Sequence, residues 1–402
     1  MSDYFSTAIE KGALLLDASN YEHATFKMGH HFRGVLAECS EGQLELGYDE
    51  PAGSYALRSK IAEWESGIGQ TWIAPQDIAI FCGGVTAAID AVFRIIKELS
   101  ADNSGEMIVP VPCYPGILRA ARANGVRATT IETEFARGFQ PTAEQISRAL
   151  TNTTRGVFLT SPGNPVTTTI ELEELIKIIA LCKQHNLILV LDAIFEDAIS
   201  ARPTDQLFGH SDYARLIKLK GPSKDRPHLH DLRIGWAVTK DEGLAERLRQ
   251  ISEVTGFSVS LIANEMLYKE FDLRHAHFLG GAASAPLKIY GSEVQEYFGI
   301  ITAGKRLVME MLAVHPAVSQ FFCPDFGNLV AIKVEKDVTS KKNIFNDDDL
   351  FNFLLAKSSV AISPGSVFGF KSEELWFRVT ISKRPEEFCL HLKRALDQLL
   401  AA

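Results

Sequence analysis

Several side chains with catalytic chemistry directly follow short apolar runs that are typical of buried strands. Asp192 comes immediately after the apolar run 187–191, and a carboxylate at the end of a buried strand is costly unless a cation or donor lies beside it. Lys224 lies in a loop beyond the run 214–219, and Arg233 follows nine residues later. Open parallel sheets place their ligands at such strand ends, so these residues are candidates for one shared site.

Three other strand ends carry residues that could hold a ligand. The run 78–81 turns through Gly83-Gly84 toward a helix, which would present backbone N–H groups and the Thr86 hydroxyl to a phosphate. Tyr114 lies between two prolines and could stack on a planar cofactor, and Asn164 is held between prolines as a fixed donor. Each feature taken alone is equally compatible with a plain turn or a packed loop aromatic.

From about residue 74 the chain alternates short apolar runs with helical stretches. We expect strands at 78–81, 107–109, 156–160, 187–191 and 214–219, with helices near 87–99, 116–124 and 172–185 between them. Near-continuous apolar strands separated by helices predict an α/β fold with a mostly parallel central sheet covered on both faces. Lys218 and Lys220 alternate with Ile217 and Leu219, and we interpret the two lysines as the polar face of a strand.

A second, smaller α+β domain is expected after about residue 285. A long amphipathic stretch at 293–314 predicts one extended helix, and the runs 329–334 and 376–381 predict strands. The first 45 residues show little periodicity. We therefore predict an N-terminal arm over 1–45 that joins the small domain, a large domain over 46–285 and a small C-terminal domain over 286–402.

The composition and net charge disfavour several classes of binding partner. The 402 residues are 46% apolar and carry a formal net charge of -9, which repels nucleic acids and anionic lipid surfaces. The chain has no basic-then-apolar leader and no apolar run near the roughly 20 residues that span a bilayer, so we expect a cytoplasmic protein. The six cysteines are scattered singly and predict reduced thiols rather than a metal site.

The order of these motifs resembles the class I and II aminotransferases, pyridoxal-phosphate enzymes of fold type I. The resemblance covers nearly the whole chain. It is carried by Tyr48-Asp49-Glu50-Pro51-Ala52-Gly53 with Leu57-Arg58, Gly84-Val85-Thr86, Tyr114, Asn164-Pro165, Asp192, Ser223-Lys224, Arg233-Ile234-Gly235-Trp236 and Phe377-Arg378.

The resemblance implies a role for each matching residue. Lys224 would form a Schiff base with the aldehyde of pyridoxal 5'-phosphate and move the substrate α-proton, and Asp192 would keep the ring nitrogen protonated. Tyr114 would stack on the ring and complete the catalytic set. Arg378 would bind the substrate α-carboxylate beside Asn164. The cofactor-binding residues implied are Tyr48, Gly84, Val85, Thr86, Tyr114, Asn164, Asp192, Phe195, Ser223, Lys224 and Arg233.

By analogy with the family, Tyr48 would reach the cofactor phosphate of a second subunit. This implies a homodimer with shared active sites. No nucleic acid, membrane or metal partner is expected.

The chain departs from the family pattern at several positions. Phe195 stands where a tyrosine usually donates to the ring oxygen, so this donor is missing and the pKa of the lysine–cofactor linkage should change. Gly221 replaces the first serine of the usual Ser-x-Ser-Lys. The spacing from Lys224 to Arg233 is one residue longer than in the family, and Val166-Thr167-Thr168 stands in place of the usual Thr-Gly. His30 and His31 lie where the family has a substrate-contacting glycine loop, and they would either bind a substrate side chain or lie exposed in an arm.

The function implied is that of a PLP-dependent enzyme acting on an α-amino acid through Schiff base and quinonoid intermediates, with transamination as the leading reaction. The alternative is a specialised enzyme of natural-product biosynthesis that carries out β/γ-elimination, γ-replacement, or arginine-type cyclisation or oxidation. Phe195 and the histidines motivate this alternative, and Ser223-Lys224-Asp225 also occurs in aminocyclopropane-carboxylate synthases. A PLP-binding transcription regulator is disfavoured because only 47 residues precede Tyr48 and the net charge is negative.

Overall fold

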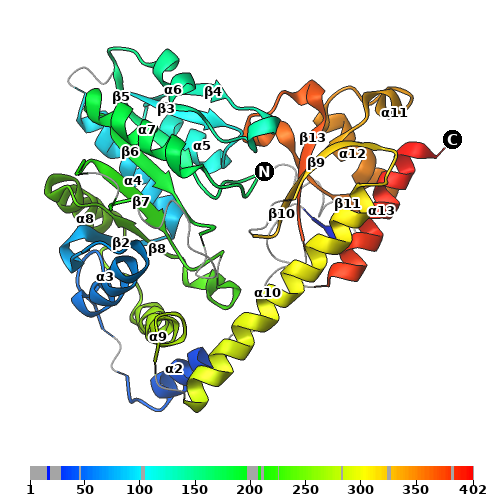
Figure 1. Cartoon of the computed structure of the whole chain (residues 1–402). Coiled ribbons are helices and arrows are strands. Elements are labelled where there is room, and N and C mark those ends of the chain that lie inside the picture. The colour runs from blue at the N-terminus through cyan, green and yellow to red at the C-terminus, as the bar shows by residue number, and fades with distance from the viewer. Residues whose placement is uncertain are drawn as a thin grey trace.

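The computed structural model describes residues 16–18, 29–44, 47–100, 105–196, 207–209, 212–224, 226–281, 284–323, 327–381 and 384–401. Within these ranges the chain forms a larger α/β unit and a smaller α+β unit. The long helix α10 (Ala285–Leu312) runs from one unit to the other (Figure 1).

The larger unit is built on a seven-stranded sheet with the strand order β2-β8-β7-β6-β5-β3-β4. Strand β8 runs antiparallel to both of its neighbours, and the other neighbouring strands pair in parallel. The carboxyl ends of the parallel strands therefore meet at one edge of the sheet, as predicted. The strands are β2 (Ile78–Cys82), β3 (Glu106–Val111), β4 (Arg127–Glu132), β5 (Thr154–Thr160), β6 (Ile188–Asp192), β7 (Leu216–Lys220) and β8 (Ile234–Val238).

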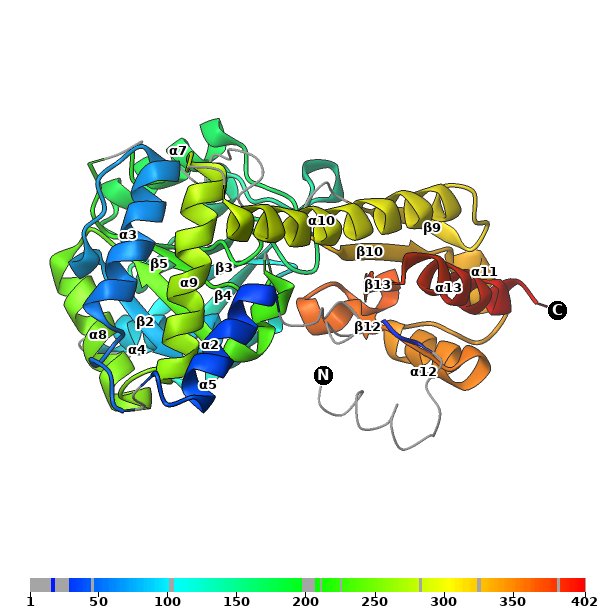
Figure 2. The same cartoon turned by 90° about the horizontal axis from the view of Figure 1, so that it is seen from below.

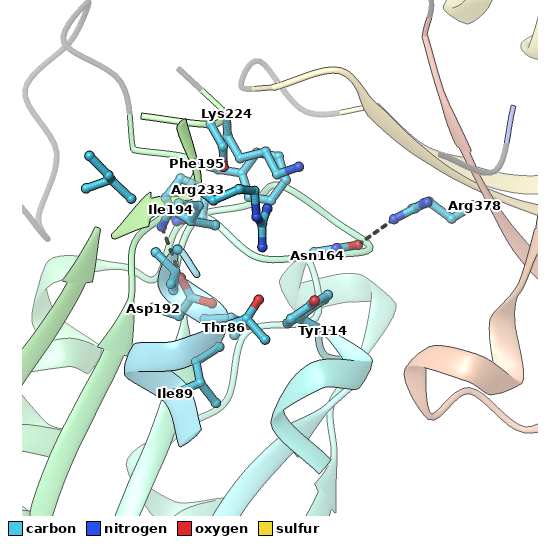
Figure 3. A pocket seen from close by; sticks show the side chains of 16 residues that line it. Thr86, Ile89, Tyr114, Asn164, Asp192, Ile194, Phe195, Lys224, Arg233 and Arg378 are labelled. Atoms are coloured by element: carbon cyan, nitrogen blue, oxygen red, sulfur yellow. Dashed lines mark hydrogen bonds between the residues drawn. The ribbon is translucent and has the colours of Figure 1, made fainter. Parts of the chain in front are cut away.

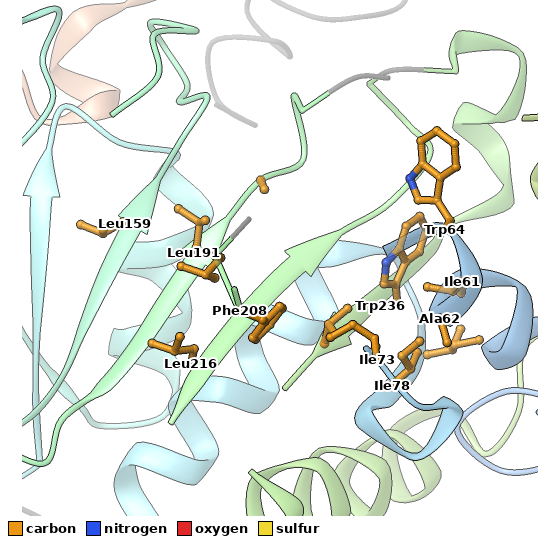
Figure 4. Close-up of a cluster of buried hydrophobic side chains, with 14 of the residues drawn as sticks. Ile61, Ala62, Trp64, Ile73, Ile78, Leu159, Leu191, Phe208, Leu216 and Trp236 are labelled. Atoms are coloured by element: carbon orange, nitrogen blue, oxygen red, sulfur yellow. The ribbon is translucent and has the colours of Figure 1, made fainter. Parts of the chain in front are cut away.

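Helices cover both faces of this sheet, which explains why most positions of its inner strands are apolar. On one face α4 (Val85–Glu98), α5 (Pro115–Ala123) and α8 (Glu242–Gly256) bury residues such as Ile89 and Phe93 against Ile217 and Leu219. The other face packs against α3 (Tyr55–Gly69), α6 (Ala143–Ala149), α7 (Leu172–Gln184) and α9 (Leu261–Phe278). Figure 4 shows part of this second core, where Trp64 of α3 lies near Trp236 of β8.

The smaller unit is a four-stranded antiparallel sheet with the order β12-β13-β10-β9. Its core combines residues such as Val330 and Phe377 with Val308 of α10, Leu354 of α12 and Leu396 of α13. The elements are β9 (Val318–Phe322), β10 (Leu329–Val334), α11 (Lys336–Ser340), α12 (Asp347–Ser358), β11 (Val360–Ala361), β12 (Ser363–Pro364), β13 (Trp376–Thr380) and α13 (Pro385–Leu400).

The described residues of the predicted N-terminal arm divide between the two units, and residues 1–15 and 19–28 of the arm lie outside the described ranges. β1 (Leu16–Asp17) pairs in parallel with β11 of the smaller unit. By contrast α2 (His30–Ser40) packs against α9 and the start of α10, because the larger core buries its apolar residues Phe32 and Val35. The assignment of all of 1–45 to the small domain therefore differs from the structure at α2.

Helix α10 begins at Ala285, eight residues before the predicted start at 293, and bridges the two units instead of belonging to one (Figure 2). Its buried residues include Tyr290, Val294, Tyr297, Ile301, Gly304 and Val308, a spacing of three to four residues that defines one face of a helix. Among the described residues, no helix combines the length and apolar character needed to cross a membrane.

Candidate active site

A cavity of about 270 Å³ opens at the edge of the large sheet where the parallel strands end. Its walls come from the turns after β2, β3, β5, β6 and β7, from the start of β8, and from β13 of the smaller unit. The lining residues are Gly84, Val85, Thr86, Ile89, Tyr114, Thr160, Pro162, Asn164, Asp192, Ile194, Phe195, Ser223, Lys224, Arg233, Ile234 and Arg378.

One end of the cavity is suited to an anion. Gly84 adopts a φ of 76° at the N-cap of α4, and no side chain caps the first turn of this helix. The Arg233 guanidinium donates to the Gly83 carbonyl at 3.0 Å, and the Gly83 N–H donates to the Arg233 carbonyl at 2.7 Å. Gly235 is required beside this turn, since a Cβ there would lie 2.4 Å from the Val85 nitrogen.

The helix terminus, the guanidinium and nearby hydroxyl groups form a site that fits a phosphate. The positive end of α4 and Arg233 supply charge, and Thr86 and Ser223 line the same cavity with hydroxyl groups. Arg233 itself has a φ of 49°, a left-handed conformation that is uncommon for an arginine and places its side chain beside the Gly83-Gly84 turn.

Asp192 is a buried carboxyl group in the cavity wall. It is 4% exposed, and one of its oxygens accepts the Ile194 N–H at 3.1 Å. Burial raises the pKa of Asp192 to about 7, while the Ile194 N–H and the positive charge of Lys224 act in the opposite direction. A buried acid of this kind is poised to pair with a cationic or protonated group of a ligand.

Lys224 contributes its side chain from the loop after β7. The pKa of Lys224 is lowered to about 7, mainly by burial and also by the guanidinium groups of Arg378 and Arg233, whereas Asp192 acts in the opposite direction. A substantial fraction of this amine is therefore neutral near pH 7 and able to act as a nucleophile or base. In Figure 3 the side chains of Lys224, Asp192 and Tyr114 surround one common space.

The middle of the cavity has flat and apolar walls. Tyr114 forms the N-cap of α5, and its ring lies against Gly116, where a Cβ would come within 2.2 Å of the ring. Phe195, Ile194 and Val85 add apolar surface. These walls would enclose a planar aromatic ring between the anion site and the smaller unit.

The smaller unit reaches the cavity through Arg378 of β13. One terminal nitrogen of its guanidinium donates to the Asn164 side-chain oxygen at 3.1 Å (Figure 3). The other terminal nitrogen donates to the Ser363 hydroxyl at 3.0 Å. The guanidinium carbon also lies 5.0 Å from the centre of the Phe368 ring. Because the Asn164 oxygen accepts from Arg378, its amide NH₂ group is directed elsewhere and can donate to a ligand.

The structure brings together most of the residues singled out from the sequence. Gly84, Val85, Thr86, Tyr114, Asn164, Asp192, Phe195, Ser223, Lys224, Arg233 and Arg378 all line the cavity. Sequence reasoning did not select five lining residues, Ile89, Thr160, Pro162, Ile194 and Ile234. Thr160, Pro162 and Ile194 lie at or close to predicted strand ends.

Three predicted site residues do not line this cavity. The Tyr48 side chain lies on the surface, where Tyr48 is 93% exposed and its ring contacts Phe257 edge-on. The His30 N–H donates to Glu293 at 2.8 Å, and a ring nitrogen of His31 lies 3.0 Å from the Pro286 carbonyl oxygen. In the single chain, both histidines thus contact α10 and do not line the cavity.

The fold and this arrangement of residues are those of fold type I, the architecture of one large class of PLP-dependent transferases. The family model "Aminotransferase class I and II" matches residues 13–396. The chain therefore belongs to the class I and II aminotransferase family.

Individual relatives are distant in sequence. An aspartate aminotransferase from Thermotoga maritima is 22% identical over 239 residues, which is 58% of this chain and 61% of that protein. A 1-aminocyclopropane-1-carboxylate synthase from Arabidopsis thaliana is 23% identical over 329 residues, 75% of this chain and 66% of that enzyme. The crystal structure of aspartate aminotransferase from Thermotoga maritima superimposes with a TM-score of 0.81 at 20% identity and covers 98% of this chain and 96% of that chain.

Proposed function

We propose that this protein binds pyridoxal 5'-phosphate in the cavity and transfers the amino group of an α-amino acid to a keto acid. The observation that carries the proposal is the placement of Lys224, an amine with a lowered pKa, in the same cavity as the buried acid Asp192. Bound pyridoxal phosphate supplies an aldehyde that condenses with amines and a ring that accepts the electrons left when a Cα–H bond breaks.

The residues present fit this cofactor. The α4 N-terminus, Thr86, Ser223 and Arg233 would hold its phosphate, and Tyr114 would lie along its ring. Asp192 would hold a proton on the ring nitrogen through a charge-assisted hydrogen bond. The Asn164 amide would donate to the ring oxygen, without the help of a hydroxyl at Phe195.

Two residues would act on the substrate. Arg378 would bind the α-carboxylate with its guanidinium, which Asn164 and Ser363 already orient. Lys224 would take the proton from Cα and return it, since its amine is neutral in part near pH 7.

The test is an amino-group transfer assay with purified protein loaded with the cofactor, a panel of amino acids and several keto-acid acceptors. We expect stoichiometric transfer by the wild type, and a Lys224→Ala variant that loses turnover by on the order of 10² to 10⁴. Full turnover by that variant would refute the role of Lys224.

A second candidate reaction is elimination, replacement or cyclisation on the same cofactor. Phe195 favours it, because the missing hydroxyl changes the environment of the ring oxygen, and the relative that is a 1-aminocyclopropane-1-carboxylate synthase provides a precedent within the family. If no acceptor receives an amino group while an amino acid loses a side-chain group, this reaction replaces transamination.

We also propose a cytoplasmic homodimer in which Tyr48 serves the partner's cavity. The exposed position of Tyr48 in the single chain supports this arrangement, since the ring is available to a second copy. Light scattering that shows a dimer, with phosphate-site affinity reduced in Tyr48→Phe, would support it, and a monomer with full activity would exclude it.

A further inference from the structure

Lys224 lies in a tight turn that is closed by the backbone. The Arg226 N–H donates to the Pro222 carbonyl at 2.9 Å, so that Lys224 occupies the middle of the turn. Its side chain enters the cavity, and its main-chain carbonyl oxygen accepts a hydrogen bond from the Tyr297 hydroxyl at 3.2 Å. Tyr297 belongs to α10 and is 5% exposed, so this contact is made away from water.

The same face of α10 is also linked, through Glu270, to Arg226 at the end of this turn. Tyr290 lies seven residues before Tyr297, two helical turns away, and its hydroxyl donates to Glu270 at 2.7 Å. The Arg226 guanidinium donates to the same Glu270 oxygen at 2.7 Å, and Arg274 donates to it at 3.0 Å. These buried contacts fix the distance between α10 and the turn, which leaves Tyr297 in place beside the Lys224 carbonyl.

Further along, α10 packs closely on the segment that follows Arg378. A Cβ at Gly304 would lie 2.7 Å from Ile381 and 3.0 Å from Pro385, so the helix and this segment are in direct contact. Ile381 is three residues beyond Arg378. One helix thus contacts both the turn that carries the amine and the segment that follows the predicted carboxylate-binding arginine.

We propose that Tyr297 is a positioning residue for Lys224: its hydroxyl fixes the Lys224 main chain and thereby the direction in which the amine enters the cavity. The proposal rests on the proposed function, because it concerns the amine that would bind the cofactor. The hydroxyl acts on the geometry of this amine relative to Asp192, Arg233 and Arg378, the charged groups that face it. Small displacements of a reacting group can have large effects on rate.

A matched control variant separates a positioning role of the Tyr297 hydroxyl from a purely structural one. The Tyr213 hydroxyl donates to the Leu187 carbonyl at 2.6 Å, which is the same type of bond at a site outside the cavity lining. Tyr297→Phe and Tyr213→Phe each remove one such hydroxyl and leave the ring in place. Both variants should fold, with comparable losses of thermal stability.

The experiment measures the visible absorption band of each protein loaded with pyridoxal phosphate as a function of pH, together with kcat and KM. We expect Tyr297→Phe to shift the pH midpoint of the band by about half a unit, the size expected for one hydrogen bond. We also expect kcat to fall about tenfold with little change in KM, while Tyr213→Phe changes neither value.

Equal behaviour of the two variants in midpoint and in kcat would overturn the role of Tyr297. A wild-type protein that develops no visible band with pyridoxal phosphate would instead refute the proposed function. The two failures are therefore distinguishable in the same experiment.

Discussion

Three lysines within seven residues of this chain have two different environments. Lys218 and Lys220 lie on β7 and point into the core between the sheet and α3, where they are 0% and 2% exposed. Their ammonium groups bind Glu196 at 2.7 and 2.9 Å, and Lys218 also binds Glu65 at 3.2 Å. Lys224, in the following turn, faces the cavity, where the charged groups that affect its pKa include two guanidinium groups and one carboxyl group.

The two environments give these lysines different tasks. The ammonium groups of Lys218 and Lys220 are held in buried ion pairs with Glu196. In Lys224, burial favours the neutral amine, and the guanidinium groups of Arg378 and Arg233 act in the same direction. The interpretation of Lys218 and Lys220 as the solvent-facing side of a strand was wrong, because helices cover both faces of this sheet and each buried charge needs a partner.

The largest expected effect concerns the pH dependence of cofactor uptake at Lys224. The reacting form is the neutral amine, so below its pKa of about 7 the rate of condensation with pyridoxal phosphate should fall tenfold per pH unit, and above it the rate should level off. An ordinary lysine would have on the order of 10³-fold less neutral amine at pH 7. Stopped-flow absorbance on the cofactor-free protein measures this profile, and a rate that climbs to pH 10 would contradict the lowered pKa.

For Lys218 and Lys220 we expect an effect on the free energy of unfolding instead. Glu196→Gln keeps the shape of the side chain but leaves two buried ammonium groups short of a negative charge, which should cost about 3–5 kcal/mol of unfolding free energy. Denaturant unfolding measures the loss. Glu246→Gln, which removes an exposed ion pair with Arg249, is the matched control and should be neutral. Equal stability of the two variants would show that the buried cluster contributes nothing.

Asp192 is the buried carboxyl group that lines the same cavity as Lys224. Asp192→Asn keeps the size of the side chain, but a neutral amide cannot hold a proton on the cofactor ring nitrogen. We expect turnover to fall by roughly 10²- to 10³-fold, while pyridoxal phosphate still binds because the anion site is intact. Steady-state kinetics and a binding titration measure the two quantities, and undiminished turnover would show that another residue protonates the ring.

The smallest expected effect is at Phe195. Phe195→Tyr would add a donor for the cofactor's ionised ring oxygen and lower the pKa of the visible band by about half a unit. A spectrophotometric pH titration detects such a shift. No shift, or an upward one, would mean that the added hydroxyl does not reach the ring oxygen.

The sequence predicted structural elements correctly where a local run of apolar residues corresponds to a buried strand. The apolar runs at 78–81, 107–109, 156–160 and 187–191 correspond to β2, β3, β5 and β6, because strands covered on both faces are apolar at every position. Strand β4 was missed, since this edge strand carries exposed and polar residues such as Arg127 and Thr130. The turns with Gly84, Asp192 and Lys224 were found because each follows an apolar run.

Contacts between distant parts of the chain could not be predicted in this way. Ser363 orients Arg378, and Tyr297 binds the turn of Lys224, yet each residue viewed alone resembles an ordinary loop serine or a core aromatic. The partnership of Glu196 with Lys218 and Lys220 likewise depends on how the turn after β6 returns beside β7. Such relations follow from topology, not from local residue patterns.

We propose that Lys224, and not its neighbours Lys218 and Lys220, is the amine that binds the cofactor. The protein should be mixed with pyridoxal 5'-phosphate, reduced with borohydride, digested and analysed by mass spectrometry. We expect one phosphopyridoxyl group, on the peptide that contains Lys224 and at that residue. A label at Lys218, Lys220 or another lysine, or no label at all, would contradict it.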